Sequence, residues 1–565
     1  MDERRKTHND QDQRPRIEIE LGDRVSRQHK AEERADFQPP RPRRDKRQQA
    51  KQRAGQKKQI REIWIEQKVH GISNFRRHYT TKSADFLKPP RQSAERRARE
   101  GCIIGATHPR HPFLKRGNAR RAGQGQKEPS LNFQNICVIG LGYIGLPTAS
   151  TFAARGRNVL GVDINGAVVS TLKRGDIHIH EPGLREEFQS ALATKRLSFA
   201  AAPAPADAFI ISVPTPFYEG ELGESDGVKF KKADMRAVIA AAESIVPHLR
   251  KGNLVVLEST SPPRTTVDLV RPILERSGLV AGRDFHLAYS PERVLPGQIL
   301  RELIENARVI GGVTPESAQA GRDLYAAFVK GQIILTDATT AEMVKLMENT
   351  TRDVNIALAN EFARLAERFG VDAWEAISIA SLHPRVKILS PGPGVGGHCI
   401  GVDPWFFVES APDIAALIQQ ARLVNDGQPR FVAESVRKTV GRLKGRKIAA
   451  LGLAYKPDVD DLRESPAAEV IHLLQSEGAL VKAFEPFKPE GLPNMECAAT
   501  LEAAIGDADV ILLLVNHTQF RELTPESLRP LTSATALFDA VNAWQGRDWE
   551  KAGFAYHRLG VGKAP

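Results

Sequence analysis

The chain has 565 residues, of which 41% are hydrophobic, so it is long enough for several domains with cores of their own. Four cysteines are too few for a disulfide scaffold and favour a reducing compartment, so we expect a cytoplasmic protein. No apolar run of the sequence approaches the roughly 20 residues that a membrane helix needs. Composition therefore argues against a disulfide-rich secreted protein and against a membrane-embedded one.

The net charge of +12 is concentrated in the first segment. Residues 1–130 hold 34 Lys and Arg against 17 Asp and Glu, net +17, whereas residues 131–565 are net −5. The segment is rich in Arg, Gln and Pro without a sustained apolar period, so it cannot bury enough surface to offset chain entropy, and we predict disorder. A polyanion or nucleic-acid arm is the alternative. Because no aromatic or glycine pattern of an RNA or DNA module accompanies the charge, we predict no nucleic-acid partner.

An apolar run, a glycine turn, a helix and a second apolar run follow one another over residues 135–165. Gly140, Gly142 and Gly145 form G-x-G-x-x-G directly after the first run, and Asp163 ends the second run 18 residues after Gly145. Small residues let a pyrophosphate approach the helix N-terminus, and a carboxylate accepts hydrogen bonds from ribose hydroxyls. The pattern predicts a dinucleotide-binding Rossmann domain, with a plain tight turn as the alternative. NAD is favoured over NADP, because Asp163 would repel an additional phosphate and no Arg follows it.

Further strand-like runs at residues 207–217, 253–261 and 284–297 extend this sheet. Ligands of an open parallel sheet lie at the carboxyl ends of its strands. Caps and strand ends explain a single polar residue there equally well. The residues at these ends are Thr215, Thr260, Glu292 and Arg293.

Residues 339–369 contain no Gly or Pro and carry apolar residues at helical spacing, which predicts one long helix. Lys345, Asn349 and Arg352 share one of its faces. A polar stripe is usually a solvated face, but this helix is apolar enough to be buried as a spine between two domains. A buried Lys is rare unless it is paired or catalytic, because burial disfavours its charge.

The segment PGPGVGGHCIGVDPW, residues 391–405, combines a glycine-rich loop with Cys399. Glycine lets backbone N–H groups turn toward an anion, which explains a phosphate cradle but leaves the thiol unexplained. Residues 446–486 then start a second strand–loop–helix–strand unit without G-x-G-x-x-G. Lys456 and Arg463 flank its loop and suit a diphosphate. The predicted fold class is thus α/β, with two Rossmann-like doubly wound domains joined by a long central helix.

Seven motifs in order resemble the UDP-glucose/GDP-mannose dehydrogenase family. They are GLGYIGLPTA, VPTPF, LESTSP, PERVLPGQ, TAEMVKLMENTTRDVNIALANE, HPRVKILSPGPGVGGHCIGVDPWF and GLAYKPDVDDLRESPA. The resemblance covers residues 133–565 and is greatest to members that oxidise UDP-N-acetyl-D-mannosamine. It implies a homodimer that converts the C6 alcohol of a UDP-amino-sugar to a carboxylate with two NAD in turn, for surface polysaccharide synthesis.

With this resemblance the chain divides into four predicted parts. They are a disordered basic extension at 1–130, an NAD-binding Rossmann domain at 131–335, a central helical and dimerisation domain with the catalytic loop at 336–440, and a UDP-sugar-binding Rossmann-like domain at 441–565.

The resemblance also gives Cys399 its chemistry. An aldehyde has no second hydride to give until a nucleophile adds to its carbonyl, so Cys399 would form a thiohemiacetal, and water would hydrolyse the resulting thioester. Backbone N–H groups of the loop are expected to lower the thiol pKa. Lys345 resembles the family's acid/base lysine, Asn349 would donate to the developing oxyanion, and Asp403 would orient water and Lys345.

The remaining implied contacts are those of the two ligands, and no metal ligand is implied. Substrate contacts are implied for Arg293, Val294, Lys345, Asn349, Arg352, His383, Arg385, Gly394, Tyr455 and Lys456, with Arg385 in many members reaching the neighbouring subunit. NAD contacts are implied for Gly140, Gly142, Tyr143, Ile144, Gly145, Asp163, Thr215, Thr260 and Arg463.

Two positions depart from relatives. UDP-glucose dehydrogenases carry a second acid four residues after the Glu of their S-P-E motif, whereas this chain has Pro296, so Glu292 joins the catalytic set without that partner. Many amino-sugar members have Lys where this chain has Val541. A substrate other than UDP-glucose is the natural interpretation of the first departure.

Two enzymatic alternatives stay open. UDP-N-acetylglucosamine 6-dehydrogenase is the nearer one, because its substrate differs only in the configuration at C2. A two-electron hydroxyacid dehydrogenase shares the NAD domain and long helix but needs no cysteine.

Deletion of residues 1–130 is expected to change the free energy of unfolding by less than about 1 kcal/mol, as for surface changes away from a core. The resemblance starts near Leu131, and leucine codons are rare bacterial starts, so the extension is interpreted as dispensable and as not translated in the cell. Melting temperature and NADH formation of residues 131–565 and of the full chain check this. Lost activity on truncation, or native protein beginning at Met1 with an ordered extension, contradicts it.

Overall fold

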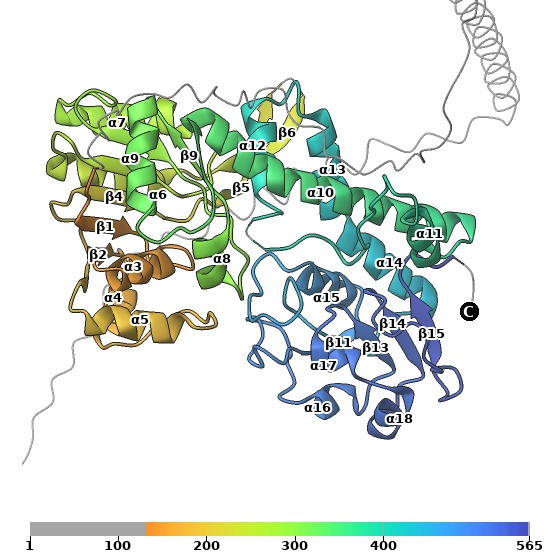
Figure 1. Cartoon of the computed structure of the whole chain (residues 1–565). Coiled ribbons are helices and arrows are strands. Elements are labelled where there is room, and N and C mark those ends of the chain that lie inside the picture. Colours follow the sequence, from red (N-terminus) through yellow and green to blue (C-terminus); the bar gives the residue numbers. More distant parts are fainter. Residues whose placement is uncertain (1–130, 226, 398, 563–565) are drawn as a thin grey trace, which may run out of the picture. The chain divides into compact units, whose positions relative to one another are not determined.

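The computed structural model describes residues 131–225, 227–397 and 399–562 (Figure 1). The basic segment 1–130, for which disorder is predicted, lies outside the described residues. The described chain contains two mainly parallel sheets, one antiparallel hairpin, one long helix and a set of shorter helices. The prediction of two Rossmann-like sheets and a long central helix is confirmed.

The first sheet has eight strands in the order β10-β9-β8-β7-β4-β1-β2-β3. From β3 to β8 this is the strand order of a dinucleotide-binding sheet. The chain adds β2 and β3 on one side of β1 and then β4, β7 and β8 on the other, so the strand order reverses between β1 and β4. All pairs are parallel except β8 with β9, an antiparallel pair that the sequence patterns did not indicate. The strands are β1 (Asn135–Ile139), β2 (Asn158–Val162), β3 (Leu197–Ala200), β4 (Ala208–Ile211), β7 (Leu254–Leu257), β8 (His286–Tyr289), β9 (Arg308–Gly312) and β10 (Ile333–Asp337).

Helices cover both faces of this sheet, because alternate strand residues point to opposite sides. Ile136 and Val138 lie in the core under α3, α5 and α9, whereas Cys137 and Ile139 lie in the core under α6 and α7. Because both faces of these strands are buried, their sequences are continuous apolar runs and do not alternate between apolar and polar residues. The helices are α3 (Gly145–Ala154), α4 (Gly166–Lys173), α5 (Leu184–Ala193), α6 (Arg236–Ile245), α7 (Arg271–Leu274), α8 (Ile299–Glu305) and α9 (Pro315–Tyr325).

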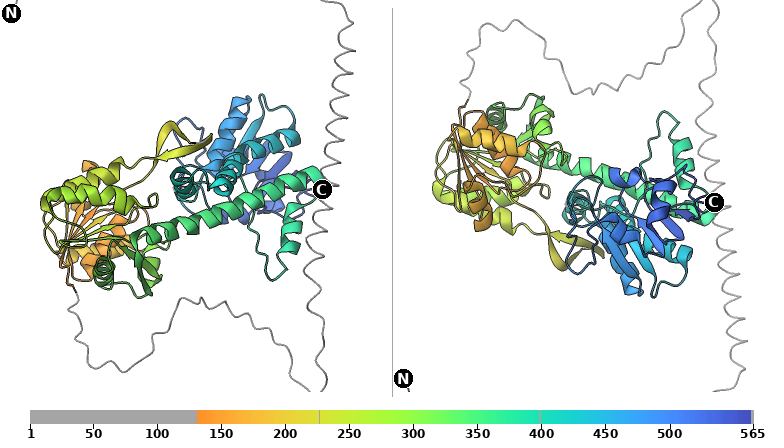
Figure 2. Two further views of the ribbon diagram at one scale, coloured as in Figure 1. Left: turned by 90° about the horizontal axis from the view of Figure 1, so that it is seen from above. Right: turned by 90° about the horizontal axis from the view of Figure 1, so that it is seen from below.

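The long helix α10 (Ala338–Phe369) follows β10 directly and begins one residue before the predicted start. The side chain of Asp337 accepts the Thr340 N–H at 2.9 Å and caps its first turn. Gly370, with φ of 68°, ends it, since few other residues adopt this conformation without strain. Figure 2 shows α10 from two further directions as one uninterrupted helix.

The second sheet has five parallel strands in the order β12-β11-β13-β14-β15. The chain adds β12 on one side of β11 and the later strands on the other side, so the strand order reverses between β11 and β13. Its strands are β11 (Lys447–Leu451), β12 (Leu480–Phe484), β13 (Val510–Leu513), β14 (Ala536–Asp539) and β15 (Ala555–Arg558). Its helices are α15 (Pro466–Ser476), α16 (Leu501–Ile505), α17 (Thr518–Arg521) and α18 (Pro525–Leu528).

The remaining elements are the hairpin β5–β6 and the helices between the sheets. The strands β5 (Phe217–Ser225) and β6 (Val228–Ala233) are antiparallel. The helices are α11 (Ala373–Ala380), α12 (Asp403–Ser410), α13 (Ala416–Asp426) and α14 (Gln428–Val440). Within the described ranges, no helix has both the length and the apolar character that crossing a membrane requires.

Candidate active site

The glycine loop after β1 has two positions that only glycine fits. Gly140 has φ of 93°, and a Cβ there would lie 2.4 Å from the Ser212 carbonyl oxygen. A Cβ on Gly145 would lie 1.8 Å from the Gly140 carbonyl oxygen. A Cβ on Gly142, by contrast, would meet nothing within 4 Å. Packing within the protein thus explains Gly140 and Gly145, while the open space at Gly142 fits a pyrophosphate at the N-terminus of α3.

Asp163 directly follows β2 and is tied to this loop. Its Oδ2 accepts the Leu141 N–H at 3.0 Å, and its Oδ1 accepts the Asn165 N–H at 2.9 Å. Each carboxylate oxygen can accept more than one hydrogen bond, and the side chain is partly exposed, so it retains acceptor capacity for ribose hydroxyls. Tyr143 and Ile144 lie between the glycines, with Ile144 at the N-cap of α3. These residues fit NAD.

Thr215 and Thr260 follow β4 and β7, which are neighbours in the sheet. The Thr215 hydroxyl donates to the Thr260 carbonyl oxygen at 2.7 Å. The hydrogen bond joins two loops at the carboxyl edge of the sheet, where ligands of such sheets bind. Both residues lie where the sequence places NAD contacts.

Replacing Asp163 by Ser together with Ile164→Arg is expected to raise the KM for NAD at least about tenfold and to improve the use of NADP. The repelling carboxylate is removed, and Ile164, which is 95% exposed, becomes a cation beside the ribose. Initial rates with each cofactor measure the change, and Ile164→Arg alone is the matched control. The interpretation of Asp163 fails if the unmodified protein already uses NADP as well as NAD.

The cysteine loop is anchored at both ends of its glycine-rich stretch. The Gly392 N–H donates to Asn360 Oδ1 on α10 at 3.0 Å, and the Gly392 carbonyl accepts from Gln428 Nε2 at the start of α14, also at 3.0 Å. Farther along, the Gly397 N–H donates to the Arg463 carbonyl at 3.1 Å. The loop is thereby held between the long helix and the second sheet.

Cys399 and Asp403 lie one turn apart, where the loop becomes α12. The Cys399 carbonyl accepts the N–H groups of Val402 and Asp403 at 3.1 and 2.9 Å. The Asp403 side chain is buried and accepts Asn349 Nδ2 of α10 at 2.6 Å. Lys345, one turn before Asn349, is partly exposed. The structure therefore brings together four of the five predicted catalytic residues, namely Cys399, Asp403, Asn349 and Lys345.

The two acids of this cluster have raised pKa values. Burial raises the pKa of Asp403 to about 6, although the Lys345 charge and the Asn349 hydrogen bond oppose the shift. Loss of surrounding water and then the Asp403 charge raise the pKa of Cys399 to about 11, against Lys345 and Arg463. The prediction that loop N–H groups lower the thiol pKa is wrong here. The Cys399 residue is nonetheless exposed.

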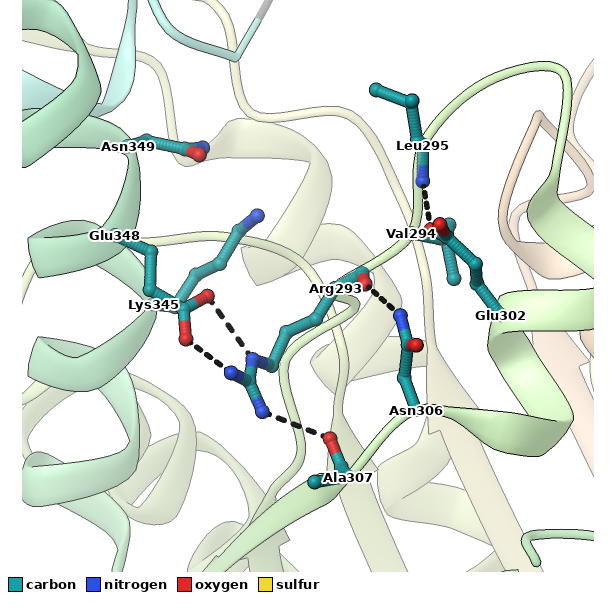
Figure 3. Close-up of a pocket in the computed structure, with 9 residues that line it drawn as sticks. All are labelled: Arg293, Val294, Leu295, Glu302, Asn306, Ala307, Lys345, Glu348 and Asn349. Atoms are coloured by element: carbon teal, nitrogen blue, oxygen red, sulfur yellow. Dashed lines mark hydrogen bonds and ion pairs between the residues drawn. The ribbon is translucent and has the colours of Figure 1, made fainter. Parts of the chain in front are cut away.

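A pocket of about 460 Å³ opens beside Lys345 and Asn349 and is lined also by the loop after β8 (Figure 3). Arg293 of this loop donates from Nε to Glu348 Oε2 at 3.0 Å and from Nη1 to the Ala307 carbonyl at 2.8 Å. Its second bond to Glu348 makes the ion pair bidentate. Lys345, Asn349, Arg293 and Val294 thus share one pocket, as a common substrate role requires.

Glu292, beside Arg293, is buried in a network that motif analysis did not reveal. Its Oε2 lies 3.5 Å from Arg308 Nη1 of β9, and its Oε1 accepts the Arg293 N–H at 2.7 Å. Arg308 also bonds to Glu258, which accepts the Tyr325 hydroxyl at 2.7 Å. Burial raises the pKa of Glu258 to about 7 despite Arg308. The network fixes the loop that carries Glu292 and Arg293.

Tyr455 and Lys456 follow β11. Lys456 contacts the loop after β8, and Tyr455 contacts the cysteine loop. Lys456 Nζ donates to the Pro296 carbonyl at 3.1 Å, and a Cβ on Gly397 would lie 2.9 Å from the Tyr455 ring. A small pocket of about 120 Å³ next to them is lined also by Gly394 and Val541. Val541 therefore stands at a predicted nucleotide pocket, where the Lys of relatives would add a charge.

Arg463 connects the loop after β11 with the glycine loop of the first sheet. Its guanidinium forms two hydrogen bonds with Asp461, at 2.8 and 2.7 Å, and lies 5.6 Å from the centre of the Tyr143 ring in the glycine loop. A cation over an aromatic face is attracted by the ring. Arg463 thus lies beside the glycine loop of the first sheet, although it belongs to a loop of the second sheet.

Arg352, His383 and Arg385 are exposed. Arg352 is on α10. Burial lowers the pKa of Lys456, and the Arg352 charge lowers it further, so the two cations are close enough to interact. His383 and Arg385 lie in the segment after α11, where the Arg385 N–H donates to His383 Nδ1 at 3.4 Å. This chain's described contacts do not bring these two into the cysteine cluster.

Comparison with known proteins identifies the family to which the chain belongs. Models of the UDP-glucose/GDP-mannose dehydrogenase family match at residues 134–329 (NAD binding domain), 339–427 (central domain) and 449–546 (UDP binding domain). UDP-N-acetyl-D-mannosamine dehydrogenase of Methanococcus maripaludis is 44% identical over 446 residues, 77% of this chain and 99% of the relative. NDP-N-acetyl-D-galactosaminuronic acid dehydrogenase of Ralstonia nicotianae is 46% identical over 430 residues, 74% and 98% of the two chains.

A solved structure agrees with these relatives. The UDP-D-ManNAc dehydrogenase of Pyrococcus horikoshii superimposes with a TM-score of 0.69 at 39% identity, over 76% of this chain and 99% of that one. The matches span the glycine loop, the long helix, the cysteine loop and the second sheet. The chain therefore belongs to the UDP-glucose/GDP-mannose dehydrogenase family and is an NAD-dependent UDP-sugar 6-dehydrogenase.

Proposed function

We propose that this chain oxidises UDP-N-acetyl-D-mannosamine to UDP-N-acetyl-D-mannosaminuronate through a thioester on Cys399, for the synthesis of a surface polysaccharide. The supporting observation is the cluster in which Cys399 stands one turn from the buried Asp403, which is bonded to Asn349 and faces the Lys345 charge. A two-electron hydroxyacid dehydrogenase would have no use for this thiol. A four-electron oxidation needs a nucleophile there.

NAD held at the open space of Gly142 and by Asp163 would supply the hydride acceptor for C6 in each oxidation. In the first, the C6 hydroxyl loses its proton to the Lys345–Asp403 pair while the C–O bond becomes a carbonyl. The Asn349 amide has two hydrogens, one of which Asp403 accepts, so the other is available for the oxygen on C6. The residues of α10 thus stabilise the charge that develops on oxygen.

In the second oxidation the sulfur of Cys399 bonds to the aldehyde carbon. The carbonyl electron pair moves to oxygen, which takes a proton from Lys345, and Asp403 accepts the thiol proton. With a pKa of about 6, Asp403 is ionised at neutral pH, so it can accept the thiol proton as the sulfur bonds to carbon. Loss of hydride and of the hydroxyl proton leaves the thioester.

Water then adds to the thioester carbonyl and the C–S bond breaks. The sulfur recovers a proton, and the carboxylate leaves with the nucleotide. Overall, alcohol and water give carboxylate, two hydrides and three protons, so atoms and electrons balance. Hydrolysis returns Cys399 to its starting thiol.

The sugar is assigned from the relatives and from Pro296. The Methanococcus maripaludis relative and the Pyrococcus horikoshii structure are named for UDP-N-acetyl-D-mannosamine, whereas the Ralstonia nicotianae relative is named for an N-acetyl-galactosamine derivative. UDP-N-acetylglucosamine remains the alternative substrate. The side chain of Pro296 offers no acid to a glucose hydroxyl.

Initial rates with NAD and each of four UDP-sugars test the substrate assignment. The sugars are those of N-acetylmannosamine, N-acetylglucosamine, N-acetylgalactosamine and glucose. We expect kcat/KM for the first to exceed each of the others at least about tenfold, as when a polar site rejects a wrong stereocentre. A higher kcat/KM for another sugar replaces our assignment with that substrate.

We also propose a homodimer in which Arg385 reaches the partner's substrate. The segment that carries Arg385 exposes large apolar side chains, with Ile379 60% and Leu382 80% exposed, and Phe369 at the end of α10 is 71% exposed. Exposed apolar side chains grouped in this way are typical of an interaction surface. Pairing of two chains would bury them and move both Arg385 side chains to the opposite subunit.

The double substitution Ile379→Asp and Leu382→Asp is expected to give a monomer that has lost most UDP-sugar oxidation but still binds NAD. Light scattering after gel filtration measures the mass, and NADH formation measures the activity. Leu480→Asp, at a leucine that is 60% exposed on β12, is the matched control and should leave the mass unchanged. A fully active monomer contradicts a shared substrate site.

A further inference from the structure

Two loops of the second sheet meet at the point where its strand order reverses. One follows β11 and carries Tyr455 and Lys456, and the other follows β13 and carries His517. Ligands of open parallel sheets bind at this switch point, between neighbouring strands that lead in opposite directions. The hydrogen bonds between these two loops therefore decide how the nucleotide meets Tyr455 and Lys456.

Glu485 occupies in this sheet the position that Asp163 occupies in the first. Each acid directly follows the strand beside the first strand of its sheet. Glu485 Oε2 accepts the N–H groups of Leu453 and Ala454 at 2.7 and 2.9 Å, as Asp163 accepts that of Leu141. Glu485 is only 1% exposed, however, so it cannot bind a ribose as the partly exposed Asp163 can.

His517 contacts Glu485 through one ring nitrogen and the β11 loop through the other. Its Nδ1 accepts the Asp458 N–H at 2.9 Å, so in the neutral ring the proton is on Nε2, which lies 3.1 Å from Glu485 Oε2 and donates to it. The ring is fully buried, with Phe487 and Phe520 at centroid distances of 5.3 and 5.4 Å. Both ring nitrogens are thereby used, and the ring has one orientation.

Asp458 needs this support because its backbone is left-handed. Its φ is 59°, which is uncommon for residues other than glycine. In addition to the His517 contact, its carboxylate accepts the N–H and the hydroxyl of Thr518, each at 2.8 Å. Residues 453–458 of the β11 loop are thus fixed at their start by Glu485 and at their end by His517.

We propose that His517 and Glu485 are positioning residues for the UDP group, holding residues 453–458 so that Tyr455 and Lys456 meet the diphosphate. The inference rests on the proposed assignment of Tyr455 and Lys456 to UDP. Lys456 is also bonded to the Pro296 carbonyl, so a displaced loop would lose this contact with the substrate loop. Affinity for the nucleotide should therefore depend on a buried histidine that does not touch it.

Two conservative substitutions separate the two hydrogen bonds of His517. His517→Gln places an amide nitrogen where Nε2 was, so it keeps the donor to Glu485 but offers no acceptor to Asp458. His517→Asn places an amide oxygen near the Nδ1 position and keeps that acceptor. Thr532→Val is the matched control, because Thr532 is a buried residue of the same domain whose hydroxyl donates to the Ile505 carbonyl.

Calorimetric titration of the full chain with UDP alone, and steady-state kinetics with the UDP-sugar, give the readouts. For His517→Gln we expect Kd for UDP and KM for the UDP-sugar to rise at least tenfold. The kcat should change less than threefold and Kd for NAD should not change. His517→Asn should restore UDP binding to within threefold, and Thr532→Val should lower the melting temperature without changing Kd for UDP.

The outcomes distinguish this inference from the proposed function. An unmodified chain that does not bind UDP contradicts the proposed function. If the unmodified chain binds UDP, an unchanged Kd in His517→Gln, or an equal weakening in Thr532→Val, overturns the positioning role. Should His517→Gln not fold, Glu485→Gln serves in its place, with an expected rise in Kd for UDP and the same overturning result.

Discussion

Cys399→Ser is expected to lower the rate of acid formation by a factor on the order of 10³ or more, comparable to the loss of other covalent nucleophiles. A hydroxyl is a far poorer nucleophile than sulfur, so the aldehyde would not become a hydride donor. Removal of the first hydride does not involve the sulfur, and binding of NAD and UDP-sugar should change less than about threefold. Mass spectrometry of the products and the amplitude of NADH formation measure both effects.

Cys497→Ser is the matched control, because Cys497 is a partly exposed thiol in the second sheet's domain, outside the cysteine cluster. It should retain the rate of the unmodified chain. Full turnover by Cys399→Ser would exclude the thioester route and leave the position of Cys399 without a function.

Asp403→Asn is expected to lower kcat at neutral pH by about 10²–10⁴-fold, the range for loss of an acid/base group. The amide oxygen can still accept the Asn349 hydrogen bond, so the change removes the charge rather than the contact. Since the pKa of Asp403 is about 6, kcat of the unmodified enzyme should fall as the pH is lowered through about 6. This acidic limb should be absent from the pH profile of the variant.

The thiol gives a second readout of the same substitution. The Asp403 charge raises the pKa of Cys399, so its removal should lower that pKa and speed alkylation by iodoacetamide at neutral pH. Glu409→Gln is the matched control, because Glu409 is a partly buried acid on the same helix, where it accepts the Ala233 N–H. Unchanged alkylation in Asp403→Asn would contradict the coupling between the two residues.

As the pH rises through about 6, Asp403 should lower the free energy of unfolding while kcat increases. An acid whose pKa is higher in the folded chain than in the unfolded one binds its proton more readily when folded. Its contribution to the free energy of unfolding is therefore present at low pH and is lost as the pH rises from about 4 to about 6. Asp403→Asn removes the cost of burying an ionised carboxylate at neutral pH. A lower kcat of this variant is therefore not explained by the loss of a stabilising charge.

The fold follows from local patterns that the sequence displays directly. The glycine loop, Asp163 at the end of the second strand and the absence of Gly and Pro from residues 339–369 each depend on a short stretch of chain. The start of α10 is displaced by one residue because Asp337 caps its first turn. The antiparallel β8–β9 pair was not indicated, because no local pattern encodes the direction of a neighbouring strand.

The site was less accessible to sequence reasoning. The pairs Arg293–Glu348 and Glu258–Arg308 join residues about 50 positions apart. In the sequence, nothing distinguishes any of the four from an ordinary surface charge. The direction of the Cys399 pKa shift depends on the loss of water around the thiol and on the Asp403 charge, neither of which the glycine pattern reveals. His517 lacked any signal except its place after β13, where the switch-point rule could have identified it.

In the proposed function, one active site performs two oxidations in succession through Cys399. The most direct test is the amount of NADH formed per mole of UDP-N-acetyl-D-mannosamine consumed to completion with excess NAD. Two moles of NADH together with the uronate are the predicted result. One mole of NADH with accumulated aldehyde would contradict the account.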